Sequence, residues 1–401
     1  MLKPEEAVLV KGQAMMKKQG VHKKRKRLKR TGKKKRIVTA VLAALPAAAA
    51  VVITVLATMY FSGRAKILAS AEREAPEAGL LTEGETVEII RAKAGLATVE
   101  WKDDWVAIDG KVYSYDSRRI NLLVLGVDKA GKMEKEPDYE KWLSGQTDAI
   151  FVVSIDPSGK SISIIGVPRN SMVNVDVYDS EDHISKTIFD QLCLQYPYAG
   201  GAEHGLEKTK EAVSSLFYNL PLHGAVAVGY EAMSRINDMA GGVDVVALES
   251  LTTPFGSYKK GESLHLEGKY VLAYVKSRDV GVIGSPTMRL ERQKQYLGAL
   301  ADKMKDKIRE NPMLVREIYD EVAGYVNTDM GIDEMVYLAV QAAGYSFSID
   351  DIFLLKGEDK AVPIMKDGSE TGDFYDDLYL DEENLKETMI RIFYREVRLY
   401  E

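Results

Sequence analysis

The chain of 401 residues contains a single cysteine, Cys193, and only five histidines. A single thiol excludes a disulfide framework, and the Cys-x-x-Cys motif that is typical of zinc sites is absent. Cys193 stands between Leu192 and Leu194, so we expect it to be a small, buried apolar residue. A nucleophilic cysteine needs a histidine beside it, and His183 and His204 are near only in sequence. Cysteine catalysis is therefore set aside.

Charge is absent from residues 37–61. About 20 apolar residues in a helix are enough to cross a bilayer, and membrane helices tolerate a proline such as Pro46. We therefore predict a single transmembrane helix over residues 37–61. The apolar core of a cleaved signal peptide is usually shorter, about 7–15 residues, which favours an uncleaved anchor.

Acidic residues are scarce before this segment and abundant after it. Residues 1–36 carry 15 Lys+Arg against two acids, whereas 39 Lys+Arg and 58 Asp+Glu follow residue 61. The positive-inside rule predicts a basic cytoplasmic tail over residues 1–36, with residues 62–401 outside the cell membrane. Basic arms can bind nucleic acid, but a position beside the span favours anionic membrane lipid. We expect no nucleic-acid partner.

The part after the span divides into three segments. Residues 62–117 begin as a linker and continue as short apolar runs separated by turn residues such as Asp109-Gly110, which predicts a small β subdomain. In residues 118–310, strand-like and helix-like segments alternate, as in an α/β fold. Residues 311–401 show further helical patterns and an acidic stretch over 376–382 that we expect to be a solvated loop. We expect a mostly helical extension there.

Charged residues stand at the ends of three apolar runs. Asp128 ends the run 120–127, Asp148 opens the run 149–155, and Arg169 follows the run 161–167. Such runs predict buried strands, and ligands of open α/β sheets bind at strand ends. Two carboxylates and a guanidinium there would suit a metal ion and a phosphate. The alternative is that each Asp merely ends a strand in an ordinary turn.

These residues belong to an ordered set of short motifs. The motifs are Gly126-Val127-Asp128, Gln146-Thr147-Asp148, Pro168-Arg169-Asn170, Lys186 before Gly200-Gly201, Gly241-Gly242-Val243, Tyr274-Val275-Lys276-Ser277-Arg278 and Arg289-Leu290-Glu291-Arg292-Gln293. Their order resembles the LytR-CpsA-Psr family of cell-wall glycopolymer ligases, and the resemblance covers about residues 118–305. The fold it implies is α/β, with a mixed central sheet flanked by helices.

The resemblance implies a substrate and a site. The substrate is a glycopolymer linked to polyprenyl pyrophosphate, which is transferred through a phosphodiester to peptidoglycan, with the lipid tail in an apolar groove. Asp148, Arg169 and Arg278 are the implied catalytic residues, and Asp128 and Asp148 the ligands of Mg²⁺ (or Mn²⁺), which prefers oxygen donors. The implied diphosphate-binding residues are Gln146, Arg169, Lys186, Lys276, Arg278, Arg289, Arg292 and Gln293. The base that activates the acceptor hydroxyl is left open between Asp148 and Asp279.

Three positions depart from the family pattern. Gln146 stands where Arg is frequent, Asn170 replaces an Asp, and Lys276 replaces an Arg. Lysine lacks the planar fork that binds phosphate through two hydrogen bonds. Two other functions stay open: a non-catalytic protein that binds lipid-linked glycans, and a transcriptional attenuator. The second conflicts with a domain held outside the cell.

Overall fold

The computed structural model describes residues 54–55, 57–69, 75–77, 101–108, 111–139, 145–279, 281–366 and 369–397. The chain divides into two units, Met1–Thr58 and Met59–Glu401, and the elements named below belong to the second. The predicted cytoplasmic tail and most of the predicted span, residues 37–61, lie outside the described residues. Within the described residues, no helix is both long and apolar enough to cross a membrane.

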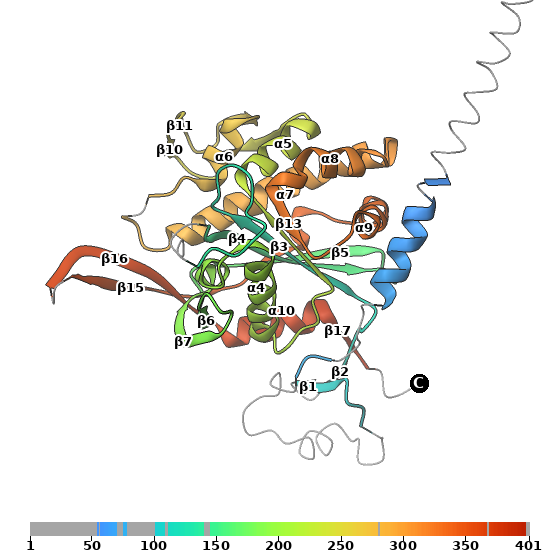
Figure 1. Cartoon of the computed structure of the whole chain (residues 1–401), viewed down its shortest axis with the longest axis horizontal. Coiled ribbons are helices and arrows are strands. Elements are labelled where there is room, and N and C mark those ends of the chain that lie inside the picture. The colour runs from blue at the N-terminus through green and yellow to red at the C-terminus, as the bar shows by residue number, and fades with distance from the viewer. Residues whose placement is uncertain are drawn as a thin grey trace, which may run out of the picture. The chain divides into compact units, whose positions relative to one another are not determined.

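A six-stranded mixed sheet forms the centre of the second unit (Figure 1). Its order is β13 (Val326–Thr328), β8 (Gly224–Val228), β3 (Ile120–Val127), β4 (Thr147–Asp156), β5 (Ser161–Val167) and β14 (Ile352–Leu354). Strand β4 runs antiparallel to both β3 and β5, whereas β8 is parallel to β3 and β14 is parallel to β5. The predicted apolar runs are thus the three adjacent central strands.

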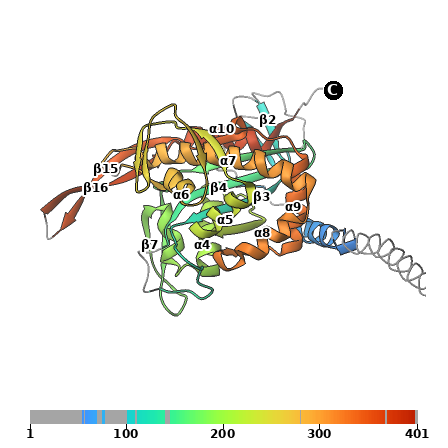
Figure 2. The same ribbon diagram turned by 90° about the horizontal axis from the view of Figure 1, so that it is seen from above.

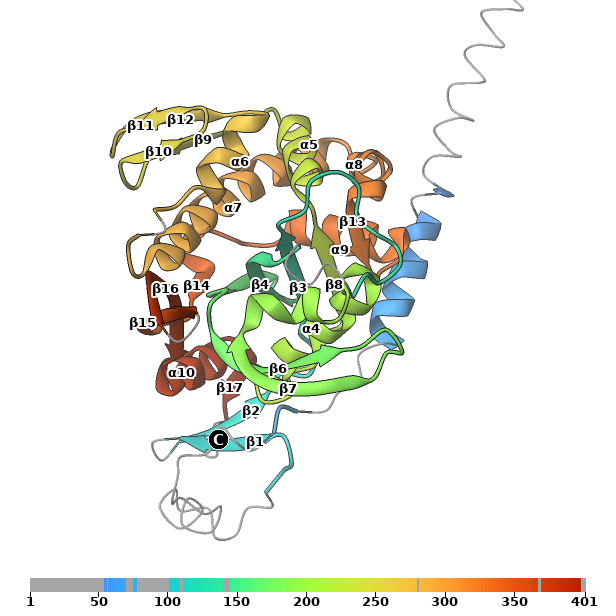
Figure 3. The same cartoon turned by 60° about the vertical axis from the view of Figure 1, so that its left-hand side comes forward.

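Helices cover both faces of the sheet (Figure 3). One face packs against α4 (Ala202–Leu216) and α10 (Glu382–Phe393), with the short α3 (Gln195–Tyr198) beside α4. The other face lies under α5 (Tyr230–Ala240), α6 (Lys269–Lys276), α7 (Ser285–Glu310), α8 (Leu314–Val322) and α9 (Ile332–Gly344).

The alternation of side chains along each strand explains why helices pack on both faces of the sheet. Leu123 and Leu125 belong to the core under α4 and α10, whereas Val124 packs in the cluster that contains Leu290 of α7. Successive side chains of a strand point to opposite faces, so a strand covered on both sides is apolar throughout. Cys193 is fully buried in the short 3-10 helix Leu192–Leu194, as expected, and burial raises the pKa of its thiol to about 11.

Several β hairpins and strand pairs lie outside the central sheet. Two hairpins, β6–β7 (Met172–Tyr178, Ile184–Gln191) and β15–β16 (Gly357–Lys366, Ser369–Leu380), extend from the body, the second one furthest (Figure 2). Two further antiparallel pairs are β9–β12 (Val243–Val246, Ser263–Leu266) and β10–β11 (Leu251–Thr253, Gly256–Tyr258). Gly241 ends α5 with φ of +82°, a left-handed conformation that glycine adopts without strain before the turn into β9.

The expected helical extension over residues 311–401 differs from the structure. Helices α8, α9 and α10 are present, but β13 and β14 are the two edge strands of the central sheet. The stretch 376–382, expected to be a solvated loop, is mostly strand β16, and Asp376 and Asp377 in it are each only 8% exposed. Residues 311–401 therefore complete the α/β fold instead of standing apart from it.

The expected small β subdomain also differs. Strands β1 (Trp105–Ile108) and β2 (Lys111–Tyr115) form the predicted hairpin, but β2 also pairs with β17 (Tyr394–Glu396) near the end of the chain. Val106 and Tyr115 belong to the core of the main body. The other expected strands, before residue 101, lie outside the described residues.

Candidate active site

Asp128 and Asp148 lie at the same edge of the sheet. Strand β3 ends at Val127 and its antiparallel neighbour β4 begins at Thr147. The register shifts by one residue after Gly126, and the backbone N–H of Asp128 donates to the carbonyl of Gln146 at 2.8 Å. A strand end and a strand start are thus joined, which sets both carboxylates beside each other.

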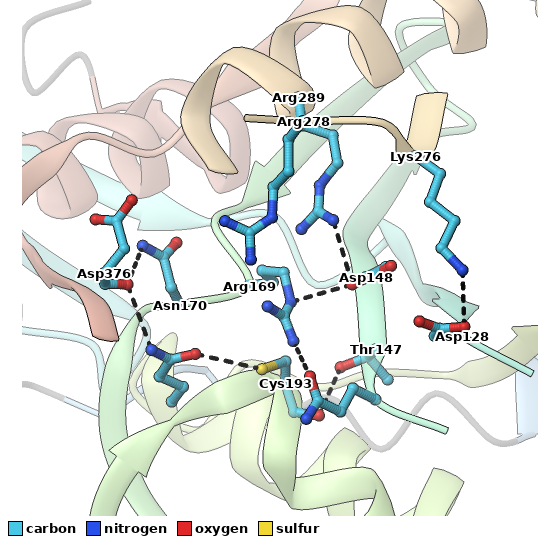
Figure 4. A network of polar contacts seen from close by, with 12 residues as sticks. Asp128, Thr147, Asp148, Arg169, Asn170, Cys193, Lys276, Arg278, Arg289 and Asp376 are labelled. Carbon is cyan, nitrogen blue, oxygen red and sulfur yellow. Dashed lines mark hydrogen bonds and ion pairs between the residues drawn. The ribbon is translucent and has the colours of Figure 1, made fainter. Parts of the chain in front are cut away.

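Asp148 forms ion pairs with two arginines. Its Oδ1 lies 3.2 Å from Arg169 Nε and 3.4 Å from Arg289 Nη1, and all three side chains are largely buried (Figure 4). Arg169 also donates to Oε1 of Gln146. An arginine at position 146, as in the family pattern, would instead place a third cation against Arg169. The Gln146 departure is therefore compatible with an ordered Arg169.

Arg289 carries more hydrogen-bonding capacity than its surroundings use. It is 4% exposed, and its Nε and Nη2 have no hydrogen-bond partner within the part of the chain described. Burial, together with Arg169 and Arg278, lowers the pKa of Arg289 to about 10, although Asp148 acts in the opposite direction. The group still carries its charge at neutral pH, so a cation with spare donors faces the site.

Arg278 joins this group from the loop between α6 and α7. Its Nη1 donates to Ser285 Oγ at 3.1 Å, and burial beside Arg169 lowers the pKa of Arg278. Repelling cations gathered around one carboxylate are stabilised when an anion binds among them.

Tyr230 connects the two carboxylates, and its role was not predicted from the sequence. Its hydroxyl donates to Asp148 Oδ2 at 3.4 Å, and the charges of Asp148 and Asp128 add to the effect of burial in raising its pKa. Lys276 Nζ lies 3.0 Å from Asp128 Oδ1 and 4.1 Å from the centre of the Tyr230 ring. Tyr230 directly follows Gly229 after strand β8, so a strand-end search extended to β8 would have found it.

Three residues expected to bind diphosphate lie elsewhere or have other partners. Arg292 is 1% exposed, donates to the carbonyls of Tyr274 and Ser277, and forms an ion pair with Glu249 at 3.0 Å. Its guanidinium ties α7 to the end of α6, so we correct its role to a structural one. Gln293 donates to the carbonyls of Asp148 and Val275 and positions Asp148.

Lys186 is the third. It lies on β7 and lines a hollow with Tyr139 and Tyr178, separate from the cavity that contains Arg169 although Tyr198 borders both. The structure therefore does not bring Lys186 to the arginines, and we withdraw it from the diphosphate site. Of the remaining expected residues, Gln146, Arg169, Arg278 and Arg289 gather around Asp148, and Lys276 lies beside Asp128.

An apolar cavity of about 210 Å³ opens next to Asp148. It lies between the sheet and helices α5, α6 and α7, and its walls are almost entirely apolar, including Phe151, Met233 and Leu297. Asp148 and Lys276 are its only charged lining residues in the described part of the chain. An apolar cavity with charged residues in its lining suits a ligand with an apolar tail and a charged head.

A polar cavity of about 400 Å³ lies on the other side of Arg169, and we call it the polar basin. Arg169 and Arg278 line it on one side, while Tyr375, Asp376 and Asp377 of strand β16 line the other. None of these three was predicted from the sequence as a site residue.

Comparisons with known proteins match most of the chain. The LytR_cpsA_psr family model matches residues 89–364. The polyisoprenyl-teichoic acid–peptidoglycan teichoic acid transferase TagV of Bacillus subtilis (strain 168) is 26% identical over 263 residues, which are 62% of this chain and 59% of that protein. The transferase of the same description, TagU, from Oceanobacillus iheyensis is 24% identical over 230 residues, 56% of this chain and 63% of that protein. The chain thus matches about three-fifths of the length of these relatives.

Solved structures share the fold. The crystal structure of B. subtilis TagV superposes with a TM-score of 0.50 at 22% identity and covers 68% of this chain and 96% of its own. The protein gbs0355 from Streptococcus agalactiae superposes with a TM-score of 0.51 at 19% identity, covering 69% and 87%. The predicted mixed sheet flanked by helices is confirmed. With a family model that spans most of the chain and the fold that goes with it, this chain belongs to the LytR_cpsA_psr family.

Proposed function

We propose that the protein transfers a glycopolymer from a polyprenyl-diphosphate carrier to peptidoglycan on the outer face of the cell membrane. One observation carries this proposal: an apolar cavity opens directly beside a carboxylate that is bound by two buried arginines, Arg169 and Arg289. A lipid diphosphate has the matching order of parts, an apolar chain followed by a compact polyanion. The descriptions of the related TagV and TagU proteins name a polyisoprenyl-linked teichoic acid and peptidoglycan.

The cavity would hold the part of the polyprenyl chain nearest the diphosphate. Each buried methylene contributes roughly 0.8 kcal/mol, so each isoprene unit in the cavity would add to the affinity for the lipid. Lys276 at the cavity mouth would face the first phosphate, although it now pairs with Asp128.

The arginines would bind the diphosphate and stabilise the charge of the leaving group. Planar guanidinium groups donate pairs of hydrogen bonds to phosphate oxygens, and Arg289 has two buried nitrogens without partners in the described residues. Arg169 and Arg278 both line the polar basin, so they would contact the diphosphate from the side opposite the lipid. Fixed donors at developing negative charge are a major source of rate enhancement.

A Mg²⁺ or Mn²⁺ ion fits these residues only in company with the substrate. No group of three or more His, Cys, Asp or Glu in the described segments could hold a metal by itself. Asp128 and Asp148 converge on Tyr230, and Mg²⁺ commonly uses one or two carboxylates, substrate phosphate oxygens and water. These two carboxylates would hold the ion. When bound, it would neutralise phosphate charge and so assist departure of the leaving group.

Membrane attachment through residues 37–61 completes the proposal, because the carrier lipid resides in the membrane. The basic residues 1–36 would stay in the cytoplasm. Protease added to intact spheroplasts should digest the part after residue 61 and leave an N-terminal tag protected. Protection of the large part would contradict both the topology and a cell-wall function.

The direct test is turnover by the full chain in detergent or nanodiscs. The protein is incubated with a lipid-diphosphate-linked glycan, Mg²⁺ and peptidoglycan oligosaccharides, and both the phosphodiester-linked product and released polyprenyl phosphate are measured. Stoichiometric formation of both supports transfer. Saturable binding of the lipid without release of polyprenyl phosphate from any glycan donor would instead indicate a binding protein.

A further inference from the structure

The polar basin is bounded by a hairpin whose second strand lies beyond the family match. The match ends at residue 364, whereas β16 runs from Ser369 to Leu380. Asn170 attaches this strand to the site: its Nδ2 donates to the carbonyl of Asp376 at 2.8 Å (Figure 4). Its own carbonyl accepts from the N–H of Leu378 at 2.9 Å. An aspartate at position 170, as in the family pattern, has no N–H for the first bond. Asn170, in place of the aspartate of the family pattern, therefore allows this hydrogen bond to the hairpin.

Asp376 presents an unused oxygen in this basin. The residue is 8% exposed, and its Oδ2 accepts from the N–H of Gly284 at 2.8 Å, just before α7. Its Oδ1 is buried and has no hydrogen-bond partner among the described residues. The Oδ1 of Asn170, which also lines the basin, is likewise buried and unpartnered. Buried polar atoms without partners are costly, and a ligand that donates hydrogen bonds would satisfy both.

The remaining lining fits a sugar. Tyr375 is 56% exposed and offers an aromatic face, and Tyr198 donates to Asp190 Oδ2 at 3.2 Å across the basin. Sugar hydroxyls both donate and accept hydrogen bonds, and the C–H faces of sugar rings pack on aromatic rings. Carboxylates and amides supply acceptors, and the two arginines supply donors. Neither a purely anionic nor a purely apolar ligand would use this mixture.

We propose that the polar basin is the acceptor subsite, which binds a sugar unit of a peptidoglycan strand with its hydroxyl directed at the diphosphate, and that Asp376 takes the proton of that hydroxyl. This inference rests on the proposed function and adds the acceptor and the base to it. The hydroxyl oxygen forms a bond to the phosphorus that carries the glycopolymer. The bond from that phosphorus to the bridging oxygen breaks, its electron pair leaves with polyprenyl phosphate, and the proton passes to Asp376 Oδ1.

The surroundings of Asp376 suit this role. Burial raises the pKa of Asp376 and the negative charge of Asp377 adds to this, while Gly284 N–H and Arg278 act in the opposite direction. A carboxylate with a raised pKa is a stronger base, and general-base efficiency increases as the pKa approaches the working pH.

The two earlier candidates for the base are less well placed. Asp148 would hold the metal ion and already pairs with Arg169 and Arg289 through Oδ1, so it is not free to take a proton. Asp279 is exposed, accepts from Gly281 N–H at 3.0 Å, and does not line the basin.

Two variants of the full chain separate binding from proton transfer in steady-state assays with lipid-linked glycan and peptidoglycan oligosaccharides. Tyr375→Ala should raise KM for the oligosaccharide about fivefold and leave KM for the lipid donor unchanged, since only the aromatic face is lost. Asp376→Asn keeps an oxygen for Gly284 N–H but cannot take a proton. Its kcat should fall on the order of a hundredfold, with an unchanged melting temperature. Asp373→Asn, an exposed aspartate on the same strand, is the matched control and should behave like the wild type.

The opposite results overturn the inference. If Asp376→Asn keeps the wild-type kcat, Asp376 is not the base. Tyr375→Ala that raises KM for the lipid donor alone shows that the basin holds the donor's glycan instead. If the wild-type protein transfers nothing, the proposed function fails, and direct binding decides about the basin. Peptidoglycan oligosaccharides should then bind the full chain saturably and the Tyr375→Ala variant several-fold more weakly; equal binding to both, or none to either, overturns the subsite.

Discussion

Arg169 Nε lies 3.2 Å from Asp148 Oδ1, and this ion pair stands at the boundary between two unlike cavities. Asp148 lines the apolar cavity, whereas Arg169 lines the polar basin. A molecule that enters one cavity with its lipid chain therefore reaches the arginines with its head group. The pair marks the position where a diphosphate would lie, and the residues around it can be tested one by one.

Asp148→Ala should abolish metal-dependent turnover without unfolding the protein. The carboxylate would hold the metal and it also orients Arg169 and Arg289, so its removal affects both the ion and the diphosphate. Transfer is measured over a Mg²⁺ series, with circular dichroism as the check on folding. Asp279→Ala, which removes an exposed carboxylate from the nearby loop, is the matched control. Full activity of Asp148→Ala, or activity of the wild type that EDTA leaves unchanged, would contradict the metal site.

Arg169→Ala and Arg278→Ala should each slow turnover on the order of a hundredfold. Loss of a donor that acts on transition-state charge typically costs about 2.7–4 kcal/mol, which corresponds to this factor or more. Single-turnover rates at saturating lipid donor give the effect on the chemical step. Lys186→Ala, in the neighbouring hollow, should keep nearly the wild-type rate. Unchanged rates in both arginine variants would show that these arginines do not stabilise the diphosphate in the transition state.

Lys276→Arg should retain activity and raise the affinity for lipid diphosphate. The side chain of Lys276 is 44% exposed and pairs with Asp128 at the mouth of the apolar cavity, so a longer planar group has room there. Arginine would keep the ion pair and add the two-pronged donor that lysine lacks. Binding of a polyprenyl diphosphate is measured by fluorescence titration of both proteins. A several-fold weaker affinity in the variant would show that the lysine is adapted to another contact.

Much of the frame was predictable because its signals are local. The runs before Asp128, after Asp148 and before Arg169 are long and apolar, and they are the three central strands of the sheet. The edge strands β13 and β14 have three residues each, too short for any alternation to be seen. Residues 311–401 were expected to be mostly helical because their helices leave a periodic pattern, whereas the longer strands β15 and β16 are rich in charged residues and show little apolar alternation.

The site was predictable only where its residues follow strands. Arg289 and Arg292 share a helix face, yet their guanidinium groups have different partners, because Arg292 meets the carbonyls at the end of α6. No sequence pattern reports that contact. Asp376 and Asp377 belong to an acidic stretch that is typical of a solvated loop, and their burial arises from packing of β16 against Asn170 and Gln191, about 185–206 residues away.

Arg292→Met should lower stability far more than it lowers catalysis. The substitution keeps an apolar stem but leaves the carbonyls of Tyr274 and Ser277 and the carboxylate of Glu249 without their donor. Breaking a buried hydrogen-bonded charge pair costs about 3 kcal/mol, and Glu249 is partly exposed, so the free energy of unfolding should fall by roughly that much or less. Urea denaturation measures it. A variant of wild-type stability with strongly impaired lipid binding would return Arg292 to the diphosphate site.

Met233→Trp should weaken binding of long polyprenyl diphosphates and leave short ones unaffected. Met233 lines the apolar cavity from α5, and the larger ring would occupy part of its 210 Å³. Displacing about two methylenes of the lipid costs about 1.6 kcal/mol, or roughly tenfold in affinity. A short-chain prenyl diphosphate, which contacts the arginines but fills little of the cavity, serves as the internal control in the same titration. If both lipids bind Met233→Trp as tightly as they bind the wild type, the polyprenyl chain lies outside the cavity. If both lose affinity alike, the substitution has disturbed the arginine cluster instead, because only a change at the shared head group affects the two ligands equally.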